Sequence, residues 1–201
     1  MRSSPEVQIK IQSGKAIINP IAGIFRRTGG IVEDRKLGQI LSNDRKETAE
    51  HVMPVDLARN DLNKHADNLI IEVFKEVQFF SHVIHLMPAV QGQIKGDPIK
   101  IVGDTFPERT LSGAPKYKAV ELIDKYENQQ RGFYGGAVGI IGPNGSVNLV
   151  IAIRSFVSKQ NKWYYQAGAG VVIHSDQEKE LQEVNNKLVT LKKVLILAEK
   201  K

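Results

Sequence analysis

Two pairs of glutamates have a spacing that could bind a divalent cation. Glu47 and Glu50 lie three residues apart in a segment with helical periodicity, and Glu180 and Glu183 repeat this spacing in a second one. Residues three apart project from the same face of a helix. Two such pairs, brought together, would offer the oxygen ligands that Mg2+ prefers. Each pair alone is also typical of a solvated helix surface, the commoner case, so this alternative stays open.

A glycine-rich run and one arginine could bind anions. The run Gly168-Ala169-Gly170 leaves backbone N–H groups unobstructed, and an anion can be held by several of them at once. A tight turn or a crowded strand crossing would need the same glycines. Arg154 follows the apolar run Leu149–Ile153, and its planar guanidinium matches a carboxylate. A solvated arginine at a strand end is the alternative.

The residue types restrict other catalytic chemistry. His82 and His85 could supply an acid, a base or an imidazole ligand, and a hydrogen-bonded structural role is equally open for each. The chain has no cysteine, which excludes disulfides, thiolate zinc sites and a cysteine nucleophile. Ser112 is predicted to cap a helix, so no Ser-His-Asp arrangement is indicated. The sequence contains neither a phosphate-binding P-loop nor a dinucleotide fingerprint.

Composition and charge indicate an ordinary globular chain. Of 201 residues, 41% are hydrophobic and 25% are charged. The net charge is +6, and residues 188–201 are lysine-rich and aliphatic. Nucleic-acid surfaces interleave basic and aromatic residues, so we expect a solvated helix face here and no nucleic-acid partner. No apolar run is long enough for a membrane helix, and residues 1–11 lack a secretory signal, so a cytoplasmic location without a membrane partner is expected.

Hydrophobic periodicity predicts the elements that must position these residues. Glu47 and Glu50 fall on a helix that Pro54 is expected to break or kink. Glu180 and Glu183 fall on a final helix. In order, we expect a hairpin over residues 7–18, an irregular glycine-rich loop over 21–30, a short helix over 33–42, a helix from 43, one or two strands over 69–80, a helix over 116–126, a strand meander over 133–174 that turns at 142–145 and 159–162, and a helix from 175.

The order of these elements indicates the fold class. Strands and helices are mixed without the regular alternation of a doubly wound sheet, so the expected class is α+β. No internal repeat or low-complexity linker marks a domain boundary. The final helix is predicted to bury an aliphatic stripe made of Leu181, Val184, Leu188, Leu191 and Leu195.

A series of sequence blocks covers nearly the whole chain. They are Ser4-Pro5-Glu6, Pro20–Gly23, Glu47–Met53, Val55–Asp61, Ser81–His85, Leu111–Lys116, Arg131–Ala137, Ile151–Arg154 and Ala167–Gly170. In this order they resemble the chorismate-binding domain of chorismate-utilising enzymes, and most closely the large subunits of anthranilate synthases. The resemblance implies part of a β-sandwich with helices packed outside. It also implies that residues 1–201 form a single partial domain, the carboxy-terminal portion, with the amino-terminal half missing.

The resemblance implies a metal site and an acid. Glu50 and Glu183 would bind Mg2+ directly, with Glu47 and Glu180 beside them. The cofactor Mg2+ would then neutralise a carboxylate of the substrate. Glu6 matches the general acid that protonates the departing ring hydroxyl.

Chorismate is the substrate that the resemblance implies. Contacts to its other carboxylate are matched by Tyr134, Arg154, Gly168, Ala169 and Gly170. Further active-site positions are matched by His85, Thr110 and Lys187.

The implied reaction adds ammonia to chorismate and eliminates pyruvate to give anthranilate, a step of tryptophan biosynthesis. A separate glutamine amidotransferase subunit would supply the ammonia, and a homo-oligomer stays open. Ala22 stands where aminodeoxychorismate synthases commonly carry a lysine, so the anthranilate branch is favoured over that folate-pathway alternative. Ile24, Arg109 and Pro54 depart from the family pattern, which leaves a catalytically inactive fragment as a second alternative.

Overall fold

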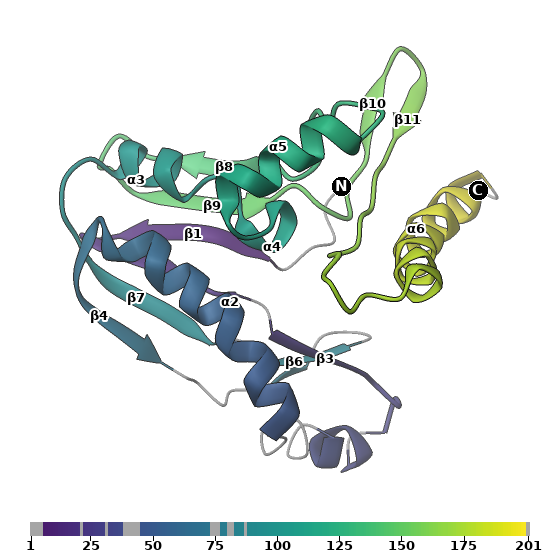
Figure 1. The fold of residues 1–201 in the computed structure, drawn as a ribbon, viewed down its shortest axis with the longest axis horizontal. Coiled ribbons are helices and arrows are strands. Elements are labelled where there is room, and N and C mark those ends of the chain that lie inside the picture. The colour runs from purple at the N-terminus through teal and green to yellow at the C-terminus, as the bar shows by residue number, and fades with distance from the viewer. Residues whose placement is uncertain are drawn as a thin grey trace. The chain divides into compact units, whose positions relative to one another are not determined.

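The computed structural model describes residues 6–20, 22–30, 32–37, 45–72, 77–79, 83–86 and 88–199. The side chains of residues 22–26, 45–53, 72, 77–79, 83–86 and 190 lie outside this description. The chain, drawn as a ribbon in Figure 1, divides into two compact units. Unit 1 comprises Met1–Pro5, Pro107–Val138 and Ile151–Lys201, and unit 2 comprises Glu6–Phe106 and Gly139–Val150.

Unit 2 contains most of a six-stranded sheet in the order β4-β7-β2-β1-β9-β8. Antiparallel pairs join β1 to β2 and β9, and β7 to β2 and β4. The turn between β1 and β2 has positive φ at Ser13 (52°) and Gly14 (74°), which confirms the predicted hairpin. The strands are β1 (Val7–Gln12), β2 (Lys15–Ile18), β4 (Ala66–Glu72), β7 (Ala89–Ile94), β8 (Ala137–Ile141) and β9 (Val147–Ile151).

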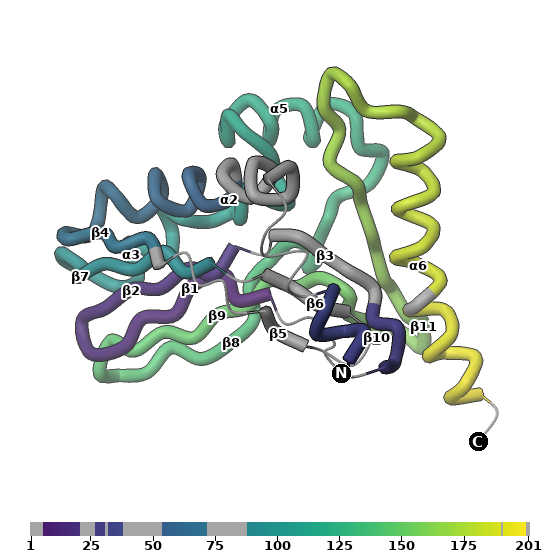
Figure 2. Tube along the Cα trace, turned by 90° about the horizontal axis from the view of Figure 1, so that it is seen from below, coloured from purple at the N-terminus to yellow at the C-terminus, as the bar shows by residue number. Residues whose placement is uncertain are grey.

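The core of unit 2 lies between this sheet and two helices. Alternation along β1 turns Ile9 and Ile11 inward, where both are buried. They belong to one cluster with Leu62 of α2 (Arg45–Asn63) and Ile101 of α3 (Pro98–Thr105). Helix α2 lies across β4 and β7 in both views (Figures 1 and 2), and it contacts both strands.

Helix α2 tests the prediction that Pro54 breaks or kinks it. The break is not observed, because α2 includes Pro54 and continues to Asn63; the kink stays a prediction. A proline removes one N–H donor and crowds the carbonyl four residues before it. The second half of α2 is held by packing, because Ala58 and Leu62 belong to the buried cluster. Tertiary burial therefore outweighs the local preference.

A second, three-stranded sheet in unit 2 corrects another prediction. Its order is β3 (Ala22–Arg26), β6 (Val83–Leu86) and β5 (Val77–Phe79). Residues 22–26 are therefore a strand and not an irregular loop, because the antiparallel partner β6 satisfies their backbone groups. The stretch 69–80 contains the end of β4 and all of β5, in agreement with the one or two strands predicted there. Residues 32–37 are helical, and the rest of the helix predicted over 33–42 lies outside the described residues.

Unit 1 contains three helices and a hairpin among its described residues. They are α4 (Arg109–Ser112), α5 (Lys116–Tyr126), β10 (Val157–Lys159), β11 (Lys162–Tyr164) and α6 (Gln177–Glu199). Figure 2 shows the extended segment that leads from β11 into α6. The predictions of α5, of the turn at 159–162 and of the final helix are confirmed. The predicted meander ends at β11, because residues 165–170 form no regular element.

Two side-chain predictions in unit 1 are wrong. Ser112 does not cap α5: its hydroxyl donates to the Glu108 carbonyl oxygen at 3.1 Å, within α4, and Pro115 is the N-cap residue. On α6, Leu191 is buried as expected, but Leu181 is 60% exposed.

The observed mixture of helices and antiparallel strands confirms the α+β class. No helix in the described part of the chain has the length and apolar character to cross a membrane.

Candidate functional site

Several predicted site residues meet in unit 1. The ammonium of Lys187 on α6 donates to the Gly168 carbonyl oxygen at 2.8 Å. The same nitrogen pairs with Glu183 Oε1 at 2.6 Å. A Cβ atom built on Gly168 would lie 3.3 Å from the Tyr134 hydroxyl oxygen, so the glycine permits a close approach of that ring. Tyr134, Gly168 and Lys187 therefore lie together in unit 1, and their roles in binding substrate stay predictions.

The start of α6 is built by hydrogen bonds that orient Glu180. Asp176 Oδ1 accepts from the Lys179 backbone N–H at 3.0 Å, which satisfies a free donor of the first turn. The Ser175 hydroxyl donates to Glu180 Oε1 at 2.8 Å and accepts from the Val172 N–H at 3.0 Å. Carboxylates in this turn also interact favourably with the helix dipole.

The carboxylates of α6 have the donor chemistry of a Mg2+ site. Glu180 and Glu183 lie on one face of the helix, and hard cations take such oxygens. Among the residues with described side chains, no group of three or more potential metal ligands gathers. Glu47 and Glu50 belong to α2 in unit 2, and their side chains lie outside the description. The donor types fit Mg2+, and the four-glutamate site stays a prediction.

A loop after α5 carries Tyr134 and is fixed by an ion pair. Arg131 donates from Nε to Glu127 Oε2 at 2.9 Å and from Nη2 to Glu127 Oε1 at 2.5 Å. Its Nη1 donates to the Leu111 carbonyl oxygen at 2.9 Å, and its Cζ lies 5.7 Å from the centroid of the Tyr134 ring. Hydrogen bonding to Glu127 raises the pKa of Arg131 above its ordinary value, although burial acts in the opposite direction.

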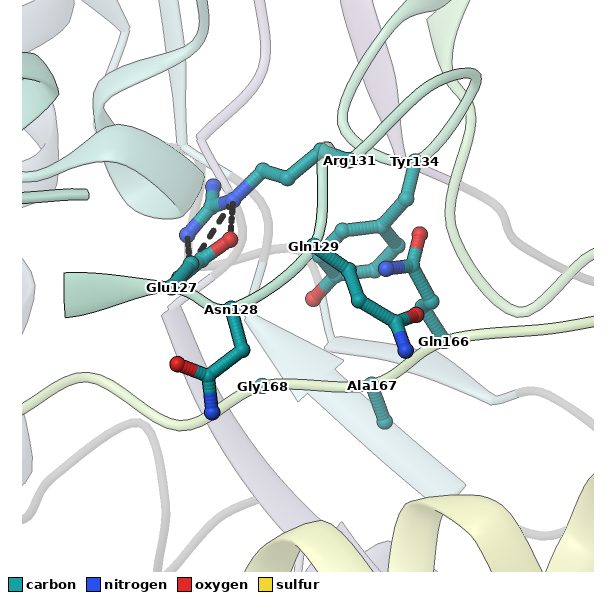
Figure 3. Close-up of a pocket in the computed structure, with 8 residues that line it drawn as sticks. All are labelled: Glu127, Asn128, Gln129, Arg131, Tyr134, Gln166, Ala167 and Gly168. Atoms are coloured by element: carbon teal, nitrogen blue, oxygen red, sulfur yellow. Dashed lines mark hydrogen bonds and ion pairs between the residues drawn. The ribbon is translucent and has the colours of Figure 1, made fainter. Parts of the chain in front are cut away.

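This loop forms one wall of an open pocket of about 350 Å3. Figure 3 shows the Arg131–Glu127 pair at one side and the Tyr134 ring beside the side-chain amides of Gln129 and Gln166. The lining residues are Glu127, Asn128, Gln129, Arg131, Tyr134, Gln166, Ala167 and Gly168. No sequence motif predicts a role for Glu127 and Arg131, although their four-residue spacing after a predicted helix is a recognisable ion-pair signal.

The other predicted residues of unit 1 lie on or beside its elements. Arg154 follows β9 with a φ of 48°, uncommon for a residue with a Cβ, and is half-buried. Thr110 lies in α4 and is exposed. Ala169 is half-buried and Gly170 exposed in the segment between β11 and α6.

Two further predicted residues belong to unit 2, besides Glu47 and Glu50. Glu6 is half-buried immediately before β1. His85 lies on β6, where its Cα pairs with that of Ile24 on β3, and its side chain lies outside the description. The departure from the family pattern at Ile24 is therefore cross-strand from a predicted active-site position. The roles of Glu6 and His85 stay predictions.

Comparison with known proteins identifies the family. The family described as chorismate binding enzyme matches residues 1–193. Anthranilate synthase component 1 of Aquifex aeolicus is 40% identical in an alignment 201 residues long that covers 98% of this chain and 41% of that protein. Its namesake in Spirochaeta aurantia is 44% identical over 191 residues, 93% of this chain and 40% of that protein.

Solved structures of enzymes with related names are also similar to this chain. Anthranilate synthase component I of Streptococcus pneumoniae has a TM-score of 0.82 and 37% identity, covering 94% of this chain and 42% of that one. The menaquinone-specific isochorismate synthase of Escherichia coli has a TM-score of 0.83 and 25% identity, covering 94% of this chain and 44% of that one.

These matches confirm the resemblance inferred from the sequence blocks. The chain spans about two fifths of the length of the curated relatives it matches. The solved relatives include both an anthranilate synthase and an isochorismate synthase, so enzymes with different names share this fold. The match over residues 1–193 nevertheless covers all of the sequence blocks, and the chain belongs to the family of chorismate binding enzymes.

Proposed function

We propose that this chain is a portion of an anthranilate synthase large subunit, which converts chorismate and ammonia into anthranilate and pyruvate. The observation that carries the proposal is the convergence of Lys187, Gly168 and Tyr134 in unit 1. The names of the relatives at 40% and 44% identity support the anthranilate branch.

The geometry of unit 1 suits a carboxylate of the substrate. Lys187 has three ammonium protons, and contacts within the described residues direct it to Gly168 and Glu183. In our proposal a further N–H of the Lys187 ammonium donates a hydrogen bond to a carboxylate of chorismate. Backbone N–H groups of the Gly168-Ala169-Gly170 run, the Tyr134 hydroxyl and the Arg154 guanidinium bind the second carboxylate.

The remaining roles rest on the family resemblance. Glu50 and Glu183, with Glu47 and Glu180 beside them, would hold Mg2+, which supplies positive charge to a substrate carboxylate. Glu6 is proposed to protonate the departing hydroxyl, with His85 and Thr110 at further active-site positions. Since the chain has no cysteine to act as an amidotransferase nucleophile, we propose a glutamine amidotransferase partner as the ammonia source.

A fluorescence assay tests the reaction. The chain is incubated with chorismate, MgCl2 and ammonium chloride, and anthranilate is measured by its emission. Lys187→Met should lower kcat/KM roughly 10-fold to 100-fold, the usual range for a hydrogen bond to a charged group. Lys118→Met is the matched control, because Lys118 lies on the exposed surface of α5 and pairs with Glu121. Anthranilate formation unaffected by Lys187→Met would contradict the proposed site.

A non-catalytic chorismate-binding chain is the second candidate, favoured by Ile24, Arg109 and Pro54. It predicts that chorismate binds without turnover in the same assay. Analysis of the product separates an anthranilate synthase from an isochorismate synthase, because addition of water to chorismate in place of ammonia yields isochorismate instead of anthranilate.

A further inference from the structure

Arg131 of unit 1 has a guanidinium whose three nitrogens all donate hydrogen bonds within the protein. Two of its nitrogens face the Glu127 carboxylate at 2.5 and 2.9 Å, and a third donates to the Leu111 carbonyl oxygen at 2.9 Å. The planar fork of a guanidinium is suited to such a bidentate pair. Because the Arg131 guanidinium already binds the Glu127 carboxylate, we expect it to position neighbouring groups and not to bind a carboxylate of the substrate.

The contacts of Arg131 connect two separate parts of unit 1. Leu111 lies in α4, twenty residues earlier in the chain. Arg131 also contacts the loop itself, because its carbonyl oxygen accepts from the Tyr134 backbone N–H at 3.0 Å. The loop is fixed at its far end as well, where Ala152 N–H donates to the Gly136 carbonyl oxygen at 2.7 Å. The backbone that carries Tyr134 is thus held on both sides.

The Tyr134 ring lies between Arg131 and the glycine run. Its centroid is 5.7 Å from Arg131 Cζ, a distance at which a cation is attracted to a ring face. Its hydroxyl oxygen approaches Gly168 so closely that a Cβ there would be 3.3 Å away. Gly168 in turn accepts from Lys187. A displacement of Arg131 would therefore alter the ring and the contact that the ring makes with the predicted carboxylate site.

We infer that Arg131, oriented by Glu127, is a positioning residue that fixes the Tyr134 ring against Gly168 and thereby sets the affinity of the site for chorismate. The part about chorismate rests on the proposed function, whereas the part about the ring does not. Lysine would not replace the arginine, because its ammonium is a point charge without a fork.

The test follows the ring and the substrate separately. In protein labelled with ring-13C tyrosine, Tyr134→Phe assigns the Tyr134 signal among the five tyrosines. Arg131→Lys should shift that signal without ligand. It should also raise KM for chorismate about tenfold with a smaller change in kcat, which is below the roughly 100-fold cost that a misplacement of about 1 Å can have. Glu127→Gln is the second variant and should act in the same direction.

Glu121→Gln is the matched control, because it removes a glutamate from an exposed ion pair on α5, also in unit 1. It should leave the Tyr134 signal and KM unchanged. If Arg131→Lys and Glu127→Gln fold but leave the Tyr134 signal and KM as they are, the inference is overturned. If they shift the signal while the unsubstituted chain neither binds nor converts chorismate, the positioning of the ring stands and the proposed function fails.

Discussion

The carboxylate of Asp34 gathers three hydrogen bonds in the segment after β3. It accepts from Arg27 Nε at 2.7 Å, from the Thr28 backbone N–H at 2.8 Å and from the Thr28 hydroxyl at 3.0 Å. The side chain is 1% exposed. The hydrogen bond from Arg27 is the main reason that the pKa of Asp34 lies below its ordinary 3.8, and it outweighs burial, which acts to raise the pKa. Ionised Asp34 thus holds Arg27 and Thr28 in place after β3.

This arrangement predicts a pH-dependent contribution to stability. Because the pKa is lower in the folded chain, ionised Asp34 stabilises the fold above about pH 4, and this contribution is lost as the pH falls through the folded pKa. Asp34→Asn should lower the urea midpoint at pH 7, and the deficit should shrink toward pH 3. Asp56→Asn is the control, since Asp56 forms an exposed pair with Arg59 and should matter less. A deficit that grows toward pH 3 would contradict this account.

At the scale of elements, Pro54 is the local weakness of α2. A proline inside a helix costs about 3 kcal/mol, partly offset by its smaller unfolded-state entropy. Pro54→Ala restores an N–H donor for the Glu50 carbonyl and should raise the free energy of unfolding by about 2 kcal/mol, measured by urea denaturation. Pro98→Ala is the matched control, because Pro98 begins α3, where proline is favoured. A loss of stability in Pro54→Ala would show that α2 needs the proline geometry.

Elements with local signals could be predicted from the sequence. Helix α5 follows a proline and has apolar residues at helical spacing, and the β10–β11 turn has positive φ at Gln160 and Asn161. Strand β3 could not be predicted, because its pairing with β6 joins residues far apart in the chain. The prediction that Leu181 is buried was wrong for a similar reason. Periodicity identifies the apolar face of α6, and only packing decides how far burial extends along that face.

The candidate site shows the same division. Spacing predicted that Glu180 and Glu183 share a helix face, and the family resemblance assigned Tyr134, Gly168 and Lys187 to one site. The bond from Arg131 to Leu111 had no signal in the sequence, because it joins a guanidinium to a backbone carbonyl in a different element. Side chain-to-backbone contacts of this kind depend on the tertiary structure alone.

At the scale of the whole molecule, charge and organisation bear on ligand binding. Lys192 and Lys193 of the basic terminal stretch are exposed on α6, as expected for a solvated face. We propose that the positive charges of Lys187 and Arg154 bind the carboxylates of the substrate. Among the predicted residues, Glu6, Glu47, Glu50 and His85 belong to unit 2, and the others belong to unit 1.

A ligand that binds the folded chain and not the unfolded chain should raise the free energy of unfolding. At a chorismate concentration 100 times Kd, the free energy of unfolding should rise by about 2.7 kcal/mol, or roughly 5 to 10 °C in Tm for a chain of this size. Because the proposed Mg2+ neutralises a substrate carboxylate, chorismate with Mg2+ should raise Tm more than the sum of the two added alone. Scanning calorimetry with and without each ligand measures this coupling.

Glu183→Gln separates the metal from the substrate. It removes a proposed Mg2+ ligand and the partner of Lys187, so the additional stabilisation by Mg2+ should disappear, whereas part of the chorismate effect remains. Glu199→Gln is the control, because Glu199 is an exposed glutamate at the far end of the same helix. Equal Tm values with and without saturating chorismate would contradict a formed substrate site. A Mg2+ effect that survives Glu183→Gln would remove this residue from the proposed ligands.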